Sequence, residues 1–452
     1  MPSYGLSASV FADVGGLVTE VLTLAFVVST CIPSLHRRAR AIAQPFVIYH
    51  VESGLSWVRL FQRYRTDAVT VVADTLCHTV SVPFYGVSLP IIMWMNPYLG
   101  THMTLLMAIT QYIGNAMKDL VSAPRPSSLK YAEVRIAQTR TMVVNEREKE
   151  LNAAEYGFPS SHAMNSLAYN FYLAAALHKH GAVSDGAASY WYGVVMVFVC
   201  TVAVSRVYLG LHTPIDILGG AVAGLAVVTA YSRLQWAWGV LDVFLYEGRV
   251  SWRLAATGLS CLLLLRLHPT PESHTPSYGT CCSERGCLCL GLLRSRRDLY
   301  RIPMAHLLSF QYHTAEFSTS FVGVAFGVIC GVQVRRTWFP DQVYGRFGFL
   351  IAPGSVFSAT LLLRLIAGLA MLGVTKLMTK WMFSRLLPLV YTYFPIRIRR
   401  LWQPPIVDTQ GGATSRGIKQ TLDGRDADID ATTRFASYAA LGFAANLGVI
   451  YW

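Results

Sequence analysis

Long apolar stretches alternate with short polar segments along most of the chain. The apolar stretches cover residues 6–33, 68–94, 101–120, 163–177, 191–204, 215–231, 252–267, 321–334, 349–372, 381–394 and 435–452. Because about 20 consecutive apolar residues cross the hydrocarbon core of a bilayer, most of these stretches predict transmembrane helices. Residues 45–64 differ, since His50, Glu52 and Arg59 are interspersed there among aromatic and aliphatic side chains. That mixture predicts an amphipathic helix lying in the membrane interface.

The polar segments divide the chain into four expected parts. Residues 1–66 hold the first apolar stretch, the basic linker 37–40 and the amphipathic segment, and residues 67–236 form a core that carries the polar motifs described below. Residues 237–400 add further transmembrane helices. Residues 401–452 are a mobile polar tail followed by a closing apolar segment, either a span or an interfacial helix. The charge-rich residues 122–156 are predicted to lie outside the membrane.

Composition agrees with a polytopic, all-α membrane protein. Of the 452 residues, 53% are hydrophobic and only 14% are charged. The net charge of +13 suits an anionic lipid surface or an anionic substrate. It does not indicate nucleic acid, because no soluble basic domain stands apart from the predicted spans. The nine cysteines show no disulfide framework.

The first polar motif is the run from Lys118 to Pro126, at the end of the apolar stretch 101–120. Lys118, Ser122 and Arg125 share one face if the helix continues through them. Pro124 and Pro126 predict that the helix ends there. Two interpretations are open. The cations bind an anion, or they extend to the membrane surface as basic side chains at helix ends commonly do.

The second motif, Gly157 to His162, leads directly into the apolar stretch 163–177. Ser160 and Ser161 lie where serine commonly caps the free N–H groups of a helix. The same N–H groups, together with the helix dipole, form a site suited to an anion. The plainer alternative is an ordinary helix cap with His162 in the first turn by chance.

The third motif places Arg206, His212 and Asp216 between two apolar stretches. Ionisable groups at a membrane boundary are costly, which makes them functional candidates. The planar guanidinium of Arg206 suits phosphate oxygens. Asp216 follows His212 by four residues, so on one helix face its carboxylate can fix the imidazole tautomer. The alternative is an Arg206–Asp216 pair that caps a helix beside an incidental histidine.

The predicted topology brings the three motifs to one side of the membrane, because an even number of crossings, or none, separates each pair. Phosphoryl transfer needs cations that neutralise the phosphate oxygens, a positioned nucleophile and an acid. The three motifs supply all of these groups. Neither an HExxH motif nor a carboxylate cluster occurs in the sequence, so no metal or other cofactor is predicted.

The motifs together resemble the three-part signature of the type-2 phosphatidic-acid phosphatase superfamily. The signature stands here as Lys118-(six residues)-Arg125-Pro126, Pro159-Ser160-Ser161-His162 and Ser205-Arg206-(five residues)-His212. The resemblance covers residues 68–236 and implies a metal-independent lipid phosphatase built on a six-helix membrane core. The superfamily usually has Gly where Ser161 stands. That departure, and the run from His268 to Glu272, are similar to the branch of phosphatases that act on sphingosine 1-phosphate and other long-chain base phosphates.

The resemblance implies a double displacement through a phosphohistidine. His212 would be the nucleophile, His162 the general acid and then base, and Asp216 the group that orients His212. The phosphate would be bound by a second set: Lys118, Arg125, Arg206, Ser160 and Ser161. A broader phosphatase of phosphatidate or lysophosphatidate is an alternative. An inactive lipid-binding relative is another, but such a protein would lack a catalytic histidine or a clamping cation, and none is missing.

The resemblance also implies the endoplasmic-reticulum membrane and a lumenal site. That orientation places the basic residues around 37–40 and 63–65 in the lumen, against the positive-inside rule. Residues 279–310 interrupt the family pattern and are predicted to be an insertion or translated sequence from an imperfect gene model. The cysteines in this segment, Cys281, Cys282, Cys287 and Cys289, fit no common zinc module.

Overall fold

The computed structural model describes residues 33–127, 156–247, 250–269, 313–339, 359–393 and 424–451. Within these ranges the regular structure is helical, with a single isolated bridge between Pro124 and Tyr156. The prediction of an all-α fold is confirmed. The predicted apolar stretch before Pro33, the interior of the charged loop, the insertion at 279–310 and the polar tail before Gly424 lie outside the described residues.

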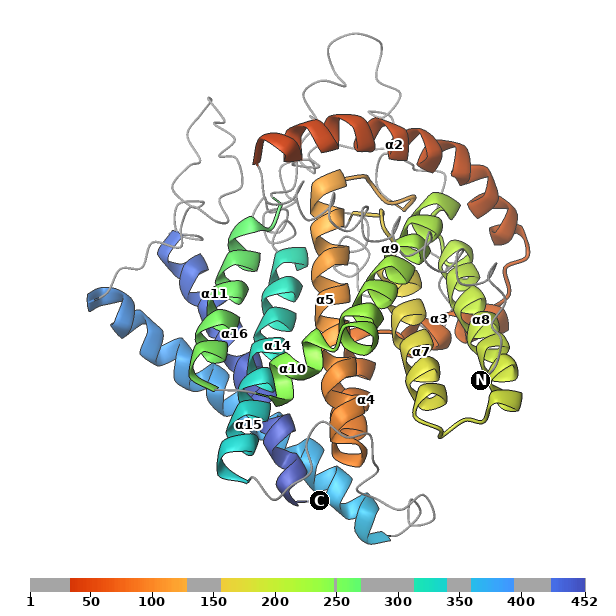
Figure 1. Ribbon diagram of the computed structural model, residues 1–452. Coiled ribbons are helices and arrows are strands. Elements are labelled where there is room, and N and C mark those ends of the chain that lie inside the picture. The colour runs from red at the N-terminus through yellow and green to blue at the C-terminus, as the bar shows by residue number, and fades with distance from the viewer. Residues whose placement is uncertain are drawn as a thin grey trace, which may run out of the picture.

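The helices form a bundle around one central element. Helix α5 (Pro97–Val121) runs through the middle, with α7 (Ser161–Lys179), α8 (Asp185–Tyr208) and α9 (Pro214–Ser232) on one side (Figure 1). On the other side lie α11 (Val250–Leu267), α14 (His313–Trp338), α15 (Ala359–Tyr393) and α16 (Gly424–Leu447). Helix α2 (Pro33–Arg63) arches over the end of the bundle at which α5 finishes. The remaining elements are α3 (Asp67–His78), α4 (Val82–Met95), the π-helix η2 (Arg233–Ala237), α10 (Val240–Tyr246) and the 3-10 helix η6 (Gly448–Tyr451).

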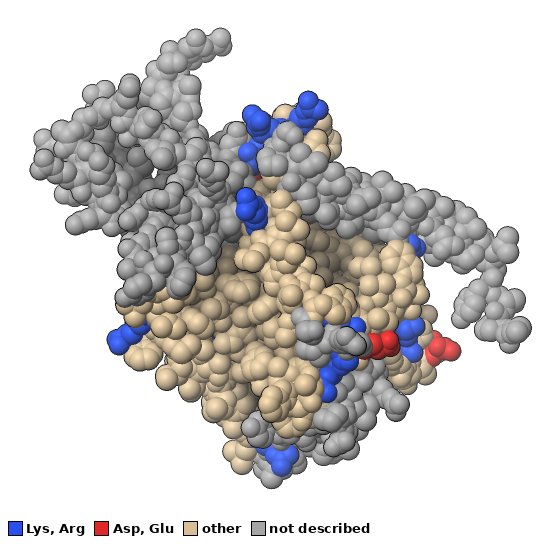
Figure 2. Space-filling model, turned by 60° about the vertical axis from the view of Figure 1, so that its left-hand side comes forward, with Lys and Arg blue, Asp and Glu red and all other residues tan. Residues whose placement is uncertain are grey.

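Four described helices are long and apolar enough to cross a membrane, which makes this a multi-pass membrane protein. They cover Asp185–Tyr208, Pro214–Ala237, Phe317–Trp338 and Leu361–Val390. The predicted span at 68–94 is broken, since α3 and α4 meet at an angle of 49° and pass the same test only when taken together. On the face shown in Figure 2, charged side chains lie mostly around the margins of a broad uncharged area, as expected for a surface in contact with lipid.

Helix α5 is the inner helix of the bundle, a position that hydropathy alone does not reveal. Its side chains are buried on nearly all sides, including polar ones such as His102 and Thr104. These groups find partners within the bundle. His102 Nδ1 lies 2.9 Å from the Tyr231 hydroxyl, and Thr104 Oγ1 donates to the Gly100 carbonyl at 2.7 Å. An inner helix therefore tolerates polar residues that a lipid-facing helix excludes.

Three predicted boundaries were wrong. The stretches 349–372 and 381–394 belong in part to one continuous helix, α15, which runs through the gap at 373–380 although the gap contains Gly373. The basic linker 37–40 is part of α2. Residues 424–430, predicted as polar tail, already form the first turns of α16.

Helices α14 and α16 cross at very short range over a row of glycines. Gly323, Gly327 and Gly331 recur every four residues on α14. A Cβ atom on Gly327 would collide with the Ala439 carbonyl of α16, and one on Gly331 would lie 2.7 Å from Cβ of Asn446. Small residues at this spacing let transmembrane backbones approach closely, so the row stabilises the second half of the bundle.

We expect Gly327→Ala to lower the free energy of unfolding by about 1–3 kcal/mol, because the added methyl group forces α14 and α16 apart. Thermal unfolding of the purified protein in detergent measures this change. Gly373→Ala on α15 is the matched control, since an added Cβ there meets nothing within 4 Å. Equal melting temperatures for the two variants would contradict the close crossing.

Candidate active site

The first motif begins in α5, and the helix ends within it. Ser122 is the C-cap of α5 and adopts the left-handed conformation, with φ of 52°. Its N–H donates to the Lys118 carbonyl and its Oγ to the Asp119 carbonyl, both at 2.8 Å. The prediction that Lys118, Ser122 and Arg125 share a helix face was therefore wrong, because the helix stops at Val121. A left-handed turn redirects the chain before Arg125.

Arg125 is brought to the site by an extended segment. Pro124 pairs in an antiparallel bridge with Tyr156, and the Gly157 N–H donates to the Ala123 carbonyl at 2.8 Å. A side chain at Gly157 would lie 3.3 Å from Cα of Arg125. This contact joins the first motif directly to the second, and Arg125 is buried beside it.

The second motif opens α7. Ser160 is its N-cap, as predicted, and its Oγ accepts from the Ala163 N–H at 3.5 Å. Ser161 is the first helical residue and does not cap the helix. Ser161 and His162 are partly exposed, whereas Ser160 is fully buried. The Ser160 N–H donates to the main-chain carbonyl of Asp216 at 2.9 Å, which joins the second motif to the third.

Glycines on α9 allow this junction to form. A Cβ atom on Gly219 would collide with the Phe158 ring, and one on Gly220 with the Ser160 carbonyl. One turn later, a Cβ on Gly224 would lie 2.7 Å from the Met164 carbonyl. The close approach of α9 to α7 therefore fixes the position of the second motif relative to the third.

The third motif is a tight turn between two spanning helices. Helix α8 ends in a Schellman motif, in which Gly210 has φ of 77° and the Leu211 N–H donates to the Arg206 carbonyl at 3.1 Å. The turn folds the chain back, so that His212 lies near Arg206. His212 is only 1% exposed, and Arg206 is buried as well.

Asp216 lies beside His212 for a reason other than the predicted one. Helix α9 starts at Pro214, so His212 is outside it and the two residues do not share a helix face. Instead, Oδ2 of Asp216 accepts from the Thr213 N–H at 2.7 Å, as in a capping box. The same oxygen also accepts from the Thr213 hydroxyl at 2.9 Å. The same oxygen lies 3.8 Å from Nδ1 of His212. Nδ1 therefore faces the carboxylate, and Nε2 is the ring nitrogen that points away from it.

Charged groups from all three motifs affect the same residue, His212. The pKa of His212 lies well below its ordinary value, first because the ring is buried and then because of the positive charges of Arg125, Arg206, Lys118 and His162. His212 is therefore a neutral imidazole at neutral pH. The buried cations Lys118, Arg125 and Arg206 put positive charge around the ring, and a neutral imidazole is able to attack an electrophile. The arrangement can bind an oxyanion and deliver a nucleophile to it.

The comparisons with known proteins agree with this geometry. Residues 99–239 match the family model described as the PAP2 superfamily. The chain carries a PAP2 superfamily domain. This is the superfamily that the three motifs predicted, and the matched range contains all eight predicted site residues.

Relatives of this chain include proteins named as lipid phosphatases. The chain is 29% identical to lipid phosphate phosphatase delta of Arabidopsis thaliana, over 95% of this chain and 91% of that protein. It is 34% identical to human sphingosine-1-phosphate phosphatase 2 over 35% of each chain. It is 23% identical to a dihydrosphingosine 1-phosphate phosphatase of Schizosaccharomyces pombe, over 68% of this chain and 61% of that protein. No solved structure matches significantly.

Helix α2 lies outside the matched PAP2 range, yet it holds the first motif in place. Arg40 donates to the carbonyls of Leu120 at 2.8 Å and of Asp119 at 2.9 Å, and the Gln44 amide donates to the Ser122 carbonyl at 3.3 Å. The buried face of α2 packs on residues of the first motif, while its outer face exposes Ile42, Phe46, Tyr49 and Trp57. The predicted amphipathic helix is thus present and covers the site.

His268 makes a second contact to the PAP2 domain from outside it. Its Nδ1 lies 3.5 Å from Oδ2 of Asp119, and its Nε2 lies 3.0 Å from the Ser318 hydroxyl of α14. Burial is the main cause that lowers the pKa of His268 to about 4. The ring is therefore neutral and connects α14 to the residue that follows Lys118. Sequence reasoning noted His268 only as part of the family pattern.

Proposed function

We propose that this protein is a metal-independent lipid phosphatase that hydrolyses long-chain base 1-phosphates through a phosphohistidine at His212. The single observation that carries the proposal is the convergence of Lys118, Arg125, Arg206 and His162 on the buried His212. Those cations match the charge of a phosphate monoester. The PAP2 domain and the names of its relatives support the same chemistry.

In the first step, Nε2 of His212 attacks phosphorus and the bond from phosphorus to the lipid oxygen breaks. The leaving alkoxide takes a proton from the His162 imidazolium. Lys118, Arg125 and Arg206 neutralise the phosphate oxygens, with Ser160 and Ser161 as further donors. Oδ2 of Asp216 lies 3.8 Å from Nδ1 of His212, which is longer than a hydrogen bond, so the positive charge that develops on the ring has a carboxylate near it.

In the second step, His162 takes a proton from water as that water attacks the phosphohistidine. The phosphorus–nitrogen bond breaks, inorganic phosphate leaves and His212 returns to its neutral form. No bound cation is needed for charge balance, since the three basic side chains supply it. Within the described residues, no group of three or more His, Cys, Asp or Glu side chains is placed to hold a metal ion.

The choice of a long-chain base phosphate rests on the relatives named for sphingosine 1-phosphate and dihydrosphingosine 1-phosphate, and on Ser161 in the second motif. The location that we propose, the endoplasmic-reticulum membrane with a lumenal site, rests on the family resemblance of the three motifs. A broader action on phosphatidate or lysophosphatidate is the second candidate, favoured by the lipid phosphate phosphatase that spans nearly the whole chain.

We expect purified protein to release phosphate from sphingosine 1-phosphate with kcat/KM at least about tenfold above that for phosphatidate, a difference of about 1.4 kcal/mol in transition-state binding. The assay contains EDTA, and added Mg²⁺ is expected to leave the rate unchanged. Equal rates on both lipids would favour the broader phosphatase, and strict dependence on Mg²⁺ would contradict the mechanism.

A further inference from the structure

The last turn of α5 is anchored by residues that lie outside the matched PAP2 range. This turn carries the buried residues Lys118 and Asp119 and ends at the left-handed cap Ser122. The Asp119 carbonyl accepts from Arg40 of α2 at 2.9 Å and from the Ser122 hydroxyl at 2.8 Å. The main chain of the turn is therefore held by α2 and by its own cap.

The side chain of Asp119 contacts a residue from the C-terminal half of the chain. His268 follows α11, and its Nδ1 lies 3.5 Å from Oδ2 of Asp119. Both side chains are buried, so the attraction between a ring N–H and the carboxylate is screened less than it would be in water. A buried carboxylate is costly without polar partners, and His268 supplies one.

The neighbours of the His268 ring fix its tautomer. Nδ1 lies 3.2 Å from the Pro269 carbonyl and 3.5 Å from the Asp119 carboxylate, and both groups are hydrogen-bond acceptors. Nδ1 therefore carries the proton. Nε2 is then an acceptor, and the buried Ser318 hydroxyl of α14 donates to it at 3.0 Å. Tyr112 of α5 packs edge-to-face on the ring, with 5.5 Å between the ring centres, so the orientation of the ring is fixed as well.

The position of Asp119 affects the proposed site through its neighbour, Lys118. Both residues belong to one helical turn, so a rotation or shift of the turn that moves Asp119 also moves Lys118. Lys118 is one of the cations whose positive charge acts on His212. A misplacement of about 1 Å in a group that binds the substrate can cost about a hundredfold in rate. The contacts that hold Asp119 therefore determine how well Lys118 meets a phosphate.

We propose that His268 is a positioning residue for the phosphatase reaction, acting through Asp119 to fix the direction of Lys118. This inference rests on the proposed function and deepens it. It makes α11 and α14, which lie outside the matched PAP2 range, part of the structure that prepares the phosphate site. Ser318 acts one contact further away, because it holds the tautomer of His268 that presents an N–H to Asp119.

Steady-state hydrolysis of sphingosine 1-phosphate, with inorganic phosphate as competitive inhibitor, tests this role. His268→Ala is expected to lower kcat/KM by about tenfold to a hundredfold and to weaken inhibition by phosphate as well. His268→Asn is expected to recover most of both losses, because its amide nitrogen can donate from the position of Nδ1. His268→Gln is expected to recover little, because its amide lies nearer the position of Nε2.

A double-mutant cycle separates action through Asp119 from general packing. In an Asp119→Ala background, His268→Ala is expected to cause less than about a twofold further loss, because the group through which it acts is already missing. Full additivity of the two substitutions would show that His268 does not act through Asp119.

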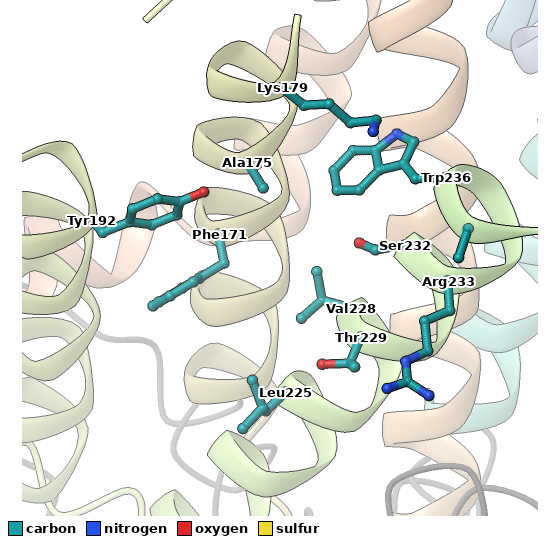
Figure 3. A pocket seen from close by; sticks show the side chains of 11 residues that line it. Phe171, Ala175, Lys179, Tyr192, Leu225, Val228, Thr229, Ser232, Arg233 and Trp236 are labelled. Atoms are coloured by element: carbon teal, nitrogen blue, oxygen red, sulfur yellow. The ribbon is translucent and has the colours of Figure 1, made fainter. Parts of the chain in front are cut away.

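Ser318→Ala is expected to cause a smaller loss in kcat/KM, about threefold to fivefold, because it removes one hydrogen bond from the His268 ring. Ser232→Ala is the matched control. It removes a hydroxyl from a groove of about 540 Å³ lined by α7, α8, α9 and η2 (Figure 3). Ser232 is the last residue of α9, about 27 Å along the helix from its first residue, and its loss is expected to leave the kinetics unchanged.

The outcomes distinguish this role from the function on which it rests. Absence of turnover by the unsubstituted protein would overturn the proposed function and the role of His268 together. Turnover by the unsubstituted protein, with equal recovery by His268→Asn and His268→Gln or with full additivity in the cycle, would overturn the role of His268 alone. Thermal unfolding in detergent confirms that the compared variants are folded. The comparison of Asn with Gln decides the question even where His268→Ala does not fold.

Discussion

The His212→Ala variant is expected to lose lipid phosphate hydrolysis by at least about 10⁴-fold in kcat, because the substitution removes the group proposed to form the covalent intermediate. The imidazole is buried, neutral and turned so that Nε2 points away from Asp216. None of the neighbouring cations can replace it as a nucleophile. Release of inorganic phosphate from sphingosine 1-phosphate by purified protein in EDTA measures the loss.

His178→Ala is the matched control. His178 lies at the far end of α7, is partly exposed and contacts Asp185 at 3.0 Å. It is expected to retain nearly full turnover. Both variants should be compared by thermal unfolding, so that loss of fold is distinguished from loss of chemistry. Normal turnover by folded His212→Ala protein would reject the assignment of His212 as the nucleophile.

Arg206→Ala is expected to reduce kcat by about 10²- to 10⁴-fold and to weaken inhibition by inorganic phosphate as well. Arg206 ends α8 in the turn that also positions His212, and its charge acts on the ring. In the proposed mechanism the guanidinium contributes to both ground-state binding and transition-state stabilisation. Steady-state kinetics with phosphate as competitive inhibitor separate the two effects.

Arg206→Lys should recover only part of the loss, since lysine keeps the charge but cannot bind phosphate through two parallel hydrogen bonds. Arg385→Ala, at an exposed position on α15, is the control for a change in net charge. An Arg206→Ala variant that bound phosphate as tightly as the unsubstituted protein would show that this cation does not contact the substrate.

The lipid-facing part of the fold could be predicted from sequence, because exposure to hydrocarbon selects directly for apolar residues. Helices α8 and α9 follow the predicted stretches 191–204 and 215–231 closely. Contacts between helices inside the bundle are harder to predict from hydropathy. The stretch 101–120 was predicted as apolar, but hydropathy did not show that α5 is the inner helix of the bundle, because it also carries polar side chains that are buried among its neighbours.

In the candidate site, too, sequence predicted some contacts between single residues and missed others. Asp216 lies 3.8 Å from His212, but the prediction that the two share a helix face was wrong because α9 begins after His212. Thr213 was overlooked, although the pattern of Thr three residues before Asp is a capping-box signal that sequence reading can find. The left-handed turn at Ser122 has no comparable signal, since serine seldom adopts it.

The role of Arg40 could not be predicted at all. Its guanidinium donates to main-chain carbonyls of residues 119 and 120, and every residue has a carbonyl, so no pairing of side-chain types reveals the contact. The same holds for the glycines of α9. They permit a close helix contact only because the backbone of another segment lies opposite them. Such features depend on tertiary structure and become visible only when the helices are assembled.

Rapid quenching of turnover with sphingosine 1-phosphate labelled at phosphorus, in EDTA, tests the proposed mechanism most directly. We expect acid-labile, alkali-stable label on the peptide that contains His212, and no label on that peptide in His212→Ala protein. Turnover without label on this peptide, or label that persists in His212→Ala protein, would contradict a phosphohistidine at His212.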